Sequence, residues 1–334
     1  GVAGVRVVVA GPQMELYVDG RRRIGPPVRF GLGVLWHLLR RGRGYDVVHT
    51  ASFPYFSLLA AGLVARLGGF RLVVDWHEVW SREYWREYLG RVGGTVGWGV
   101  QRLCARLPQR AFCFSRLHAA RLREEGLRGT VEVLEGEYAG GAAGPGSAGP
   151  QPAEPVVMLA GRLIPEKRAT ALIPAFALAA RQVPGLRAAI YGDGPERAAV
   201  TRAVAAHGLG AAVSLHGFVA TDELERALGS ALCMVLASRR EGYGMIVVEA
   251  SARGTPSVVV AGPDNAATEL IADGVNGVIA ASAEPEVLAA AIVRVAEAGP
   301  ALRESTAAWY AANARRLSLA QSLERVLASY AAAA

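Results

Sequence analysis

The stretch Val-Val-Met-Leu-Ala-Gly-Arg-Leu-Ile-Pro-Glu-Lys-Arg occupies residues 156–168. Its first five residues are apolar, which predicts a buried strand. The polar residues then fall at the carboxyl end of that strand, where open α/β sheets bind ligands. Lys167 is the one lysine among 36 basic residues, and lysine is a compact point charge that can approach a single phosphate oxygen, unlike the wide arginine fork. Either Lys167 serves an anion site with Arg162, or it is a solvated side chain on a helix face.

Similar apolar runs lie on both sides of this stretch. Before it, strands are predicted at Val5–Ala10, Asp46–Thr50 and Arg71–Asp75, and helices at Gly31–Arg41 and Ser57–Leu67. After it, strands are predicted near 187–191, 212–216, 231–237 and 256–260, separated by helices. Two successive blocks of alternating strands and helices predict an α/β fold with two doubly wound, Rossmann-like domains that face each other across a cleft.

A run of small residues separates the two blocks. Residues 140–153 read Gly-Gly-Ala-Ala-Gly-Pro-Gly-Ser-Ala-Gly-Pro-Gln-Pro-Ala, a composition typical of an interdomain linker. We therefore expect a first domain over residues 1–139 and a second over residues 154–300. Residues 301–334 are rich in alanine and predict C-terminal helices, which we expect to cross back to the first domain.

Composition fits a soluble protein, with 52% hydrophobic and 19% charged residues. The three cysteines form no Cys-x-x-Cys pair, so we expect a reducing cytoplasm and no zinc site. The chain begins with Gly1 and shows no charged-then-apolar leader, so no signal peptide is expected. The uncharged residues 47–65 approach the length of a membrane span, but Pro54 and His49 interrupt them and favour a strand, a loop and a buried helix.

The positive charge is concentrated in the first half of the chain. Residues 1–150 hold 20 arginines and 12 acidic residues, a net charge of +8. The whole chain carries +7, so the remaining residues carry −1. No aromatic and basic stacking motif points to nucleic acid. Scattered arginines near Trp76, Trp80, Trp85 and Trp98 instead suit an anionic membrane surface or a phosphorylated acceptor. We expect peripheral contact at the inner face of the membrane, with simple solubility as the alternative.

Two further loops follow predicted strands in the second half. Gly192-Asp193-Gly194-Pro195 allows a tight turn close to a ligand, although most such turns are only turns. In Glu241-Gly242-Tyr243-Gly244-Met245, the glycines let backbone amides at the start of the next helix face an anion. Glu241 is expected in the loop, and Glu249 one turn or more into the helix. Two carboxylates repel phosphate, so they suit the hydroxyls of a sugar or ribose; the alternative is a capped helix with a solvated glutamate at each end.

An ordered set of motifs connects these loops. It runs through Gly161-Arg162-Leu163 with Glu166-Lys167, Gly192-Asp193-Gly194-Pro195, Leu215-His216-Gly217-Phe218, Glu241 and Glu249, Gly262-Pro263-Asp264-Asn265, Glu269-Leu270-Ile271 and Asp273-Gly274-Val275-Asn276-Gly277. In this order and spacing the set resembles the retaining nucleotide-sugar glycosyltransferases of family 4 (glycosyl transferases group 1), which have the GT-B fold. The resemblance covers roughly residues 156–280 closely and the first half only loosely.

The resemblance implies a role for each matching residue. Arg162 and Lys167 would neutralise the donor diphosphate as the glycosidic bond breaks. Glu241 would hold hydroxyls of the transferred sugar and Glu249 those of the ribose. The remaining donor-binding residues would be Gly244 and Met245, whose amides meet the sugar and phosphates, together with Tyr243, Gly192 and Asp193.

In the first half, Val73-Val74-Asp75-Trp76-His77-Glu78 resembles the family's strand that ends in an active-site histidine. His77 would then be a fourth catalytic residue, beside Arg162, Lys167 and Glu241, although a lone histidine after a buried strand is more often structural. No Asp-x-Asp occurs, so we expect no metal and no cofactor, with Arg162 and Lys167 in place of Mg²⁺.

The chain departs from the family at its start. Val5 to Pro12 resembles the second strand of the fold, so the first domain is expected to lack its opening strand and helix, and no Gly-Gly loop precedes this segment. Either the chain is a fragment or the opening is rebuilt, with Arg21 to Pro27 as a candidate lining.

The expected function is retaining, metal-independent transfer of a sugar from a UDP or GDP sugar to an acceptor hydroxyl. The acceptor is expected to be a sugar, a lipid-linked molecule or a small molecule. One alternative is a catalytically silent module that binds nucleotide sugars, because the shortened first half then organises no acceptor. A sugar-nucleotide epimerase on the same fold is a further alternative, which the spacing of Glu241 and Glu249 fits less well.

Overall fold

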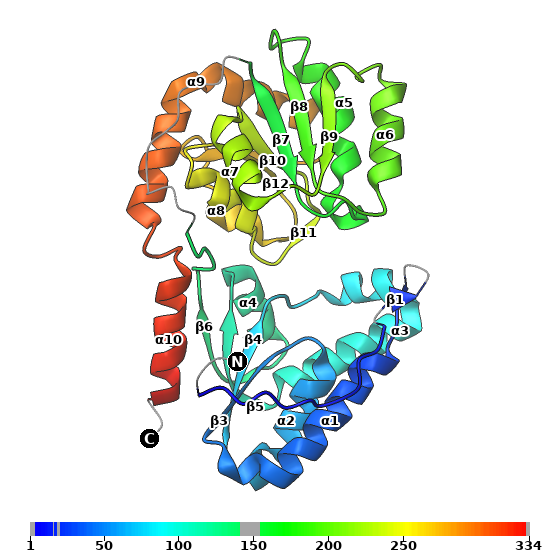
Figure 1. Ribbon diagram of the computed structural model, residues 1–334, viewed down its shortest axis with the longest axis vertical. Coiled ribbons are helices and arrows are strands. Elements are labelled where there is room, and N and C mark those ends of the chain that lie inside the picture. The colour runs from blue at the N-terminus through cyan, green and yellow to red at the C-terminus, as the bar shows by residue number, and fades with distance from the viewer. Residues whose placement is uncertain (1–3, 16, 19–20, 141–153, 332–334) are drawn as a thin grey trace. The chain divides into compact units, whose positions relative to one another are not determined.

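A computed structural model describes residues 4–15, 17–18, 21–140 and 154–331, and Figure 1 follows the chain by colour from its amino to its carboxyl end. The chain divides into two compact units, Gly1–Leu134 and Glu135–Ala334. Residues 141–153, which make up nearly all of the predicted linker, lie outside the described residues.

The first unit is built on a parallel sheet whose four strands follow chain order. These strands are β3 (Val47–Ala51), β4 (Arg71–Trp76), β5 (Pro108–Cys113) and β6 (Arg128–Val133). The helices are α1 (Gly25–Arg41), α2 (Tyr55–Gly68), α3 (Arg82–Ala105) and α4 (Arg116–Glu124), with a 3-10 turn η1 at Gly42–Gly44. Because every strand is added on the same side of the one before, right-handed connections bring the helices to one face of the sheet. The core on that face joins Val74 and Trp76 of β4 to Leu58 of α2 and Leu122 of α4.

The predicted strand at Val5–Ala10 is wrong. This segment has no regular structure, and Val5, Val7 and Val9 are exposed. Alternating apolar residues suit a strand, but a strand also needs a neighbouring strand to pair with, and pairing is a property of the tertiary fold. Beyond the segment, only a short antiparallel pair forms before α1 in the part of the chain described, between β1 (Tyr17–Val18) and β2 (Arg21–Arg22).

The second unit contains a six-stranded parallel sheet of order β14-β12-β10-β7-β8-β9. Its strands are β7 (Val156–Ala160), β8 (Arg187–Tyr191), β9 (Val213–Gly217), β10 (Cys233–Leu236), β12 (Ser257–Val260) and β14 (Gly277–Ala280). The predicted strands at 156–160 and 187–191 are confirmed residue for residue. A second small sheet pairs β11 (Arg240–Glu241) with β13 (Asp264–Asn265).

Helices cover both faces of this sheet (Figure 1). They are α5 (Leu172–Ala179), α6 (Arg197–Ala206), α7 (Thr221–Ser230), α8 (Met245–Ser251) and α9 (Pro285–Asn313), with 3-10 turns η2 (Pro165–Lys167), η3 (Ala169–Ala171) and η4 (Ala266–Leu270). A last helix, α10 (Leu319–Ala331), follows α9 in the chain. Val157 and Leu159 of β7 face the core shared with α5 and α9, whereas Met158 faces the side on which Ala227 of α7 lies. Because the chain adds β8 on one side of β7 and β10 on the other, β7 marks the reversal at which doubly wound sheets bind ligands.

The C-terminal region is helical, as predicted, although α9 begins at Pro285 and continues past residue 300. Gly299 has non-helical backbone angles and is followed by Pro300, so the long helix is broken at that point. None of the helices within the described ranges combines the length and the apolar character needed to cross a membrane.

Gln101 is a fully buried polar side chain that joins three parts of the first unit. Its Oε1 accepts hydrogen bonds from the Tyr55 hydroxyl at 3.0 Å, the Trp80 amide at 3.1 Å and the Trp85 indole at 3.1 Å. Its amide nitrogen donates to the Trp80 carbonyl at 2.9 Å. One glutamine thereby satisfies donors from α2, from the loop after β4 and from α3.

Replacing Gln101 with leucine should leave two buried donors, the Tyr55 hydroxyl and the Trp85 indole, without this acceptor, and each such group costs about 1–3 kcal/mol. We expect Gln101→Leu to lower the free energy of unfolding by about 3 kcal/mol, measured by urea denaturation. Gln182→Leu, at an exposed position, is the matched control and should change stability little. Equal effects of the two substitutions would contradict the role of Gln101.

Candidate functional site

The loops after β7 and β8 are joined through their backbones. The Gly161 amide donates to the Tyr191 carbonyl at 3.0 Å, and the Leu163 amide donates to the Asp193 carbonyl at 2.9 Å. The Gly192 amide in turn donates to the Gly217 carbonyl at 2.6 Å. The predicted loops at Gly161–Leu163 and Gly192–Pro195 therefore lie side by side at the carboxyl edge of the sheet.

Glycine is required where these loops touch. Gly192 and Gly194 have φ values of 117° and 155°, and a Cβ on either would collide with the carbonyl oxygen of Gly161 or Leu163. A larger residue would separate the two loops or strain the backbone. The Gly-Asp-Gly motif thus sets the approach of the loops, while the Asp193 carboxylate accepts from the Gly194 amide at 2.7 Å and lies 3.6 Å from the Arg197 guanidinium.

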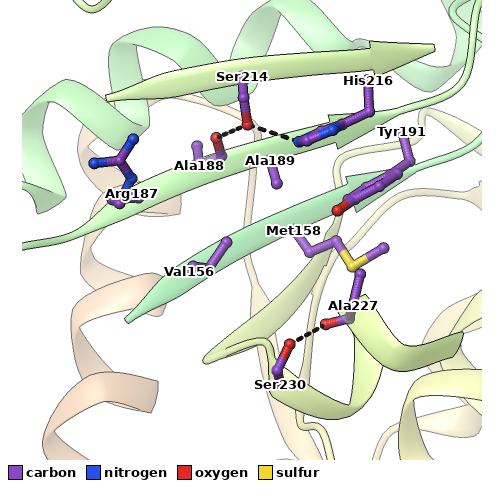
Figure 2. A pocket seen from close by; sticks show the side chains of 10 residues that line it. All are labelled: Val156, Met158, Arg187, Ala188, Ala189, Tyr191, Ser214, His216, Ala227 and Ser230. Atoms are coloured by element: carbon purple, nitrogen blue, oxygen red, sulfur yellow. Dashed lines mark hydrogen bonds between the residues drawn. The ribbon is translucent and has the colours of Figure 1, made fainter. Parts of the chain in front are cut away.

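A hollow of about 220 Å³ is lined by residues of β7, β8, β9 and α7, whose side chains are drawn in Figure 2. The His216 and Tyr191 rings stack there with centroids 4.5 Å apart, and the Ser214 hydroxyl lies 2.9 Å from His216 Nε2. The histidine of the Leu-His-Gly-Phe motif thus packs on the residue that precedes Gly192. We interpret His216 as a support for the Gly192 loop.

Lys167 and Glu241 are in direct contact. The Lys167 ammonium donates to Glu241 Oε1, and the Ser238 hydroxyl donates to the same oxygen at 2.7 Å. Glu241 is 8% exposed, so this carboxylate is held by a cation and a hydroxyl inside the unit. The structure brings together two of the predicted catalytic residues from loops that are 74 residues apart in the chain.

Glu241 is not in a free loop, as the sequence had suggested, but in the two-residue strand β11. The pairing of β11 with β13 places Glu241 opposite Asn265. The buried Asn265 amide donates to the Ser238 carbonyl at 3.1 Å and to the Val260 carbonyl at 2.8 Å, which fixes the loop after β10. The sequence assigned no role to Ser238 or Asn265, although Asn265 belongs to the Gly262-Pro263-Asp264-Asn265 motif and Ser238 lies two residues after β10.

Cations crowd the same edge of the sheet. The Arg168 guanidinium, at a residue with φ of 48°, donates to the Ala237 carbonyl at 2.8 Å. Burial lowers the pKa of Arg168, and the nearby Arg239 lowers it further; burial also lowers the pKa of Arg240. The Arg162 side chain is exposed and makes no hydrogen bond or ion pair within the part of the chain described, while its carbonyl accepts from the Ile164 amide at 3.0 Å. Such a concentration of positive charge favours an anionic ligand.

The loop after Glu241 leads into α8. Gly244 has φ of 103°, and a Cβ there would lie 2.6 Å from the Ala267 Cβ, so the position needs glycine. Met245 is the first residue of α8 and Glu249 the fifth, as the sequence predicted. Burial raises the pKa of the Glu249 carboxyl above its ordinary value, an effect that Arg253 opposes. Glu249 is thus a half-buried carboxylate, and hydrogen-bond donors from a ligand would favour its ionised form.

Tyr243 differs from the other predicted donor-binding residues. Its ring is 7% exposed, and its hydroxyl donates to the Glu135 carbonyl. The hydroxyl of Tyr243 is therefore occupied by the protein itself.

His77 lies in the first unit, directly after β4. Its exposed ring stacks on Phe114 with centroids 4.6 Å apart. Partial loss of solvent lowers the pKa of His77, and the charge of Asp75 opposes this shift. A lowered pKa keeps the imidazole neutral at physiological pH, so that it can accept or donate a hydrogen bond. No group of three or more metal-binding side chains is found within the described residues.

Family models match most of the chain. The model described as "Glycosyl transferases group 1" matches residues 146–316, and the one described as "Glycosyltransferase Family 4" matches residues 3–135. Among curated relatives, the alpha-D-kanosaminyltransferase of Streptomyces kanamyceticus is 30% identical over 46% of this chain and 39% of its own length. The D-inositol 3-phosphate glycosyltransferase of Segniliparus rotundus is 33% identical over 55% of this chain and 41% of its own. The chain spans less than half the length of these relatives.

Solved structures share the fold. HepE of Anabaena in complex with UDP aligns with a TM-score of 0.72 and 19% identity, over 89% of this chain and 82% of that one. The sucrose-phosphate synthase of Thermosynechococcus elongatus gives a TM-score of 0.72 and 18% identity, over 96% and 83%.

Removing the Lys167 ammonium should leave the buried Glu241 carboxylate without its cation. We expect Lys167→Met to lose about 2 kcal/mol of stability, measured by urea denaturation, because a buried carboxylate without its cation is costly. Lys167→Met combined with Glu241→Gln should recover most of the loss, and an equal loss in the single and the double variant would contradict the pairing.

Proposed function

The chain belongs to the glycosyl transferases group 1 family, and from this premise we propose that it transfers a sugar from a nucleotide diphosphate sugar to an acceptor hydroxyl, with retention at the anomeric carbon. The observation that carries the proposal is the contact between Lys167 and Glu241 at the strand reversal, with the exposed Arg162 in the same loop as Lys167. A cation and a carboxylate in contact can bind the two chemically different parts of such a donor, its phosphates and its sugar.

The ammonium of Lys167 has three donors, and Glu241 occupies one of them. The other two can meet oxygens of the diphosphate while the ion pair stays intact. Arg162 adds a fork that can hold two oxygens at once. As the glycosidic bond breaks, negative charge accumulates on the leaving diphosphate, and these fixed cations stabilise it without a metal ion.

Glu241 would orient the transferred sugar. Its Oε1 already accepts from Lys167 and Ser238, which fixes the carboxylate and leaves Oε2 for sugar hydroxyls. Glu249 would accept from ribose hydroxyls, an interaction that stabilises its ionised form. The amides of Gly244 and Met245 would meet the sugar and phosphates, and the loop of Gly192 and Asp193 would border the base or ribose.

In the first unit, a neutral His77 would hydrogen-bond the donor sugar. The departing phosphate is the proposed acceptor of the proton that the acceptor hydroxyl loses, since the family resemblance implies a front-face mechanism.

The choice of nucleotide and acceptor follows the relatives. UDP is the first nucleotide to test, because HepE, which shares the fold, was solved in complex with UDP. A GDP sugar is the second, since a relative in Mycolicibacterium smegmatis is named as a GDP-mannose-dependent mannosyltransferase of phosphatidylinositol monomannoside. That name and the D-inositol 3-phosphate glycosyltransferase support a sugar or lipid-linked acceptor. We propose that the reaction takes place in the cytoplasm.

One exposed side of α3 supports peripheral contact with a membrane. Val92, Val96 and Leu103 are 80%, 62% and 55% exposed, and their spacing puts them on one side of the helix. Arg91 is also exposed beside this stripe. An apolar stripe with neighbouring arginines suits the interface of an anionic bilayer.

Arg162→Met should reduce kcat by about 10²- to 10³-fold, because it removes a charge aimed at the leaving group. Stability should stay unchanged, because Arg162 is exposed. The assay follows hydrolysis and transfer with a panel of UDP and GDP sugars, in the presence of a chelator. Arg181→Met, at another exposed arginine of the unit, is the control.

Unchanged kcat in Arg162→Met would contradict the role in phosphate binding. Donor binding by the wild-type chain without hydrolysis or transfer would identify the silent binding module instead. Loss of turnover on chelation would contradict metal independence.

Val92→Asp combined with Val96→Asp should weaken binding to vesicles that contain anionic lipid by about tenfold, measured by co-sedimentation. Val275→Asp, at an exposed valine of the second unit, should leave vesicle binding unchanged. Equal binding of all three proteins would contradict a role for α3.

A further inference from the structure

Tyr243 lies inside the loop from Glu241 to Gly244 but is engaged elsewhere. Its hydroxyl donates to the Glu135 carbonyl at 2.5 Å. Burial raises the pKa of this hydroxyl well above its ordinary value, so the group stays protonated as a donor at all physiological pH values. A buried hydroxyl bound to a backbone carbonyl joins two segments that are 108 residues apart.

Glu135 begins the segment by which the chain enters the second unit, directly after Leu134. Its carboxylate lies 3.0 Å from the Arg316 guanidinium. Three residues later, the Tyr138 amide donates to the Leu317 carbonyl at 3.2 Å, and the Leu319 amide donates to the Tyr138 carbonyl at 2.9 Å. The segment at 135–138 is thereby fastened to the segment that leads into α10.

These two segments also touch through glycine. A Cβ on Gly136 would collide with the Ser318 carbonyl oxygen, so the backbones approach as closely as they can. The segments at 135–138 and 316–319 are therefore paired along their backbones. We call this pair the crossing segments, because residues 135–138 connect the first unit to the second.

The loop side of the Tyr243 contact is equally fixed. Two residues before Tyr243, Glu241 is held by Lys167 and Ser238, and the next residue, Gly244, packs on Ala267. A ligand that binds Glu241 or the Gly244 amide and shifts this loop would therefore also shift Tyr243. Because its hydroxyl holds Glu135, that displacement reaches the crossing segments.

We propose that Tyr243 is a positioning residue that couples the Glu241–Gly244 loop to the crossing segments, in place of the donor-binding role that the sequence suggested. The inference rests on the proposed function only for the identity of the ligand, a nucleotide diphosphate sugar. The physical link is one buried hydrogen bond, so replacing Tyr243 with phenylalanine breaks it while the buried ring remains.

The test compares Tyr243→Phe with Tyr55→Phe. Tyr55 is also buried, and its hydroxyl makes a hydrogen bond of 3.0 Å to Gln101 in the first unit. Both variants should lose stability to a similar degree. Tyr243→Phe should also raise the donor KM and lower kcat/KM by about tenfold, the effect of losing one buried hydrogen bond, whereas Tyr55→Phe should keep wild-type kinetics.

Hydrogen exchange reads the coupling directly. In the wild-type chain, saturating UDP should slow exchange of the Tyr138 and Leu319 amides by about threefold or more, and in Tyr243→Phe this response should be lost. Wild-type kinetics together with a wild-type exchange response in Tyr243→Phe would overturn the proposal.

A second arm works without a nucleotide. Glu241→Gln loosens the loop from Lys167, and it should change exchange at Tyr138 and Leu319 only when the Tyr243 hydroxyl is present. If the wild-type chain binds neither UDP nor GDP, the proposed function fails, and this arm still decides the coupling. An equal effect of Glu241→Gln with and without the hydroxyl would overturn the coupling.

Discussion

The ion pair between Lys167 and Glu241 is the interaction on which the candidate site depends. It forms beside β7, where the order in which the chain adds strands to the sheet reverses. It joins the loop after β7 to the loop after β10. A buried carboxylate is costly unless a cation and hydrogen bonds compensate it. Here the ammonium and the Ser238 hydroxyl both bind one oxygen, so the carboxylate is fixed before any ligand arrives.

A steric constraint places the remaining loop. Gly192 and Gly194 pass so close to the backbone of residues 161–163 that no side chain can be accommodated. The loops after β7 and β8 consequently share hydrogen bonds. Arg162 lies between Gly161 and Leu163, whose amides donate two of them. The ion pair thus joins the loop after β7 to the loop after β10, and close backbone packing joins it to the loop after β8. Together these contacts fix the three loops at the carboxyl edge of the sheet. Burial lowers the pKa of Arg168 there, and the positive charge of Arg239 lowers it further.

The two halves of the chain differed in how well the sequence predicted them. In the second unit, strands whose central residues are buried on both faces produce continuous apolar runs, so β7 and β8 were identified to the residue. In the first unit, β5 and β6 were missed, because Arg110, Arg128 and Glu132 interrupt their apolar pattern. The opposite error occurred at Val5–Ala10, where the pattern suited a strand but no strand pairs with it among the described residues.

The sequence by itself determined the kind of fold and supplied the candidate residues of the site. Periodicity, glycine positions and the order of polar residues after strands depend on local structure, which is encoded within a few residues. Only the tertiary structure decided which of these residues meet. It paired Lys167 with Glu241, placed Glu241 in a strand with Asn265 opposite, and gave the Tyr243 hydroxyl to Glu135. Those contacts join segments far apart in the chain. They depend on strand order and on the directions of side chains, and no short stretch of sequence contains that information.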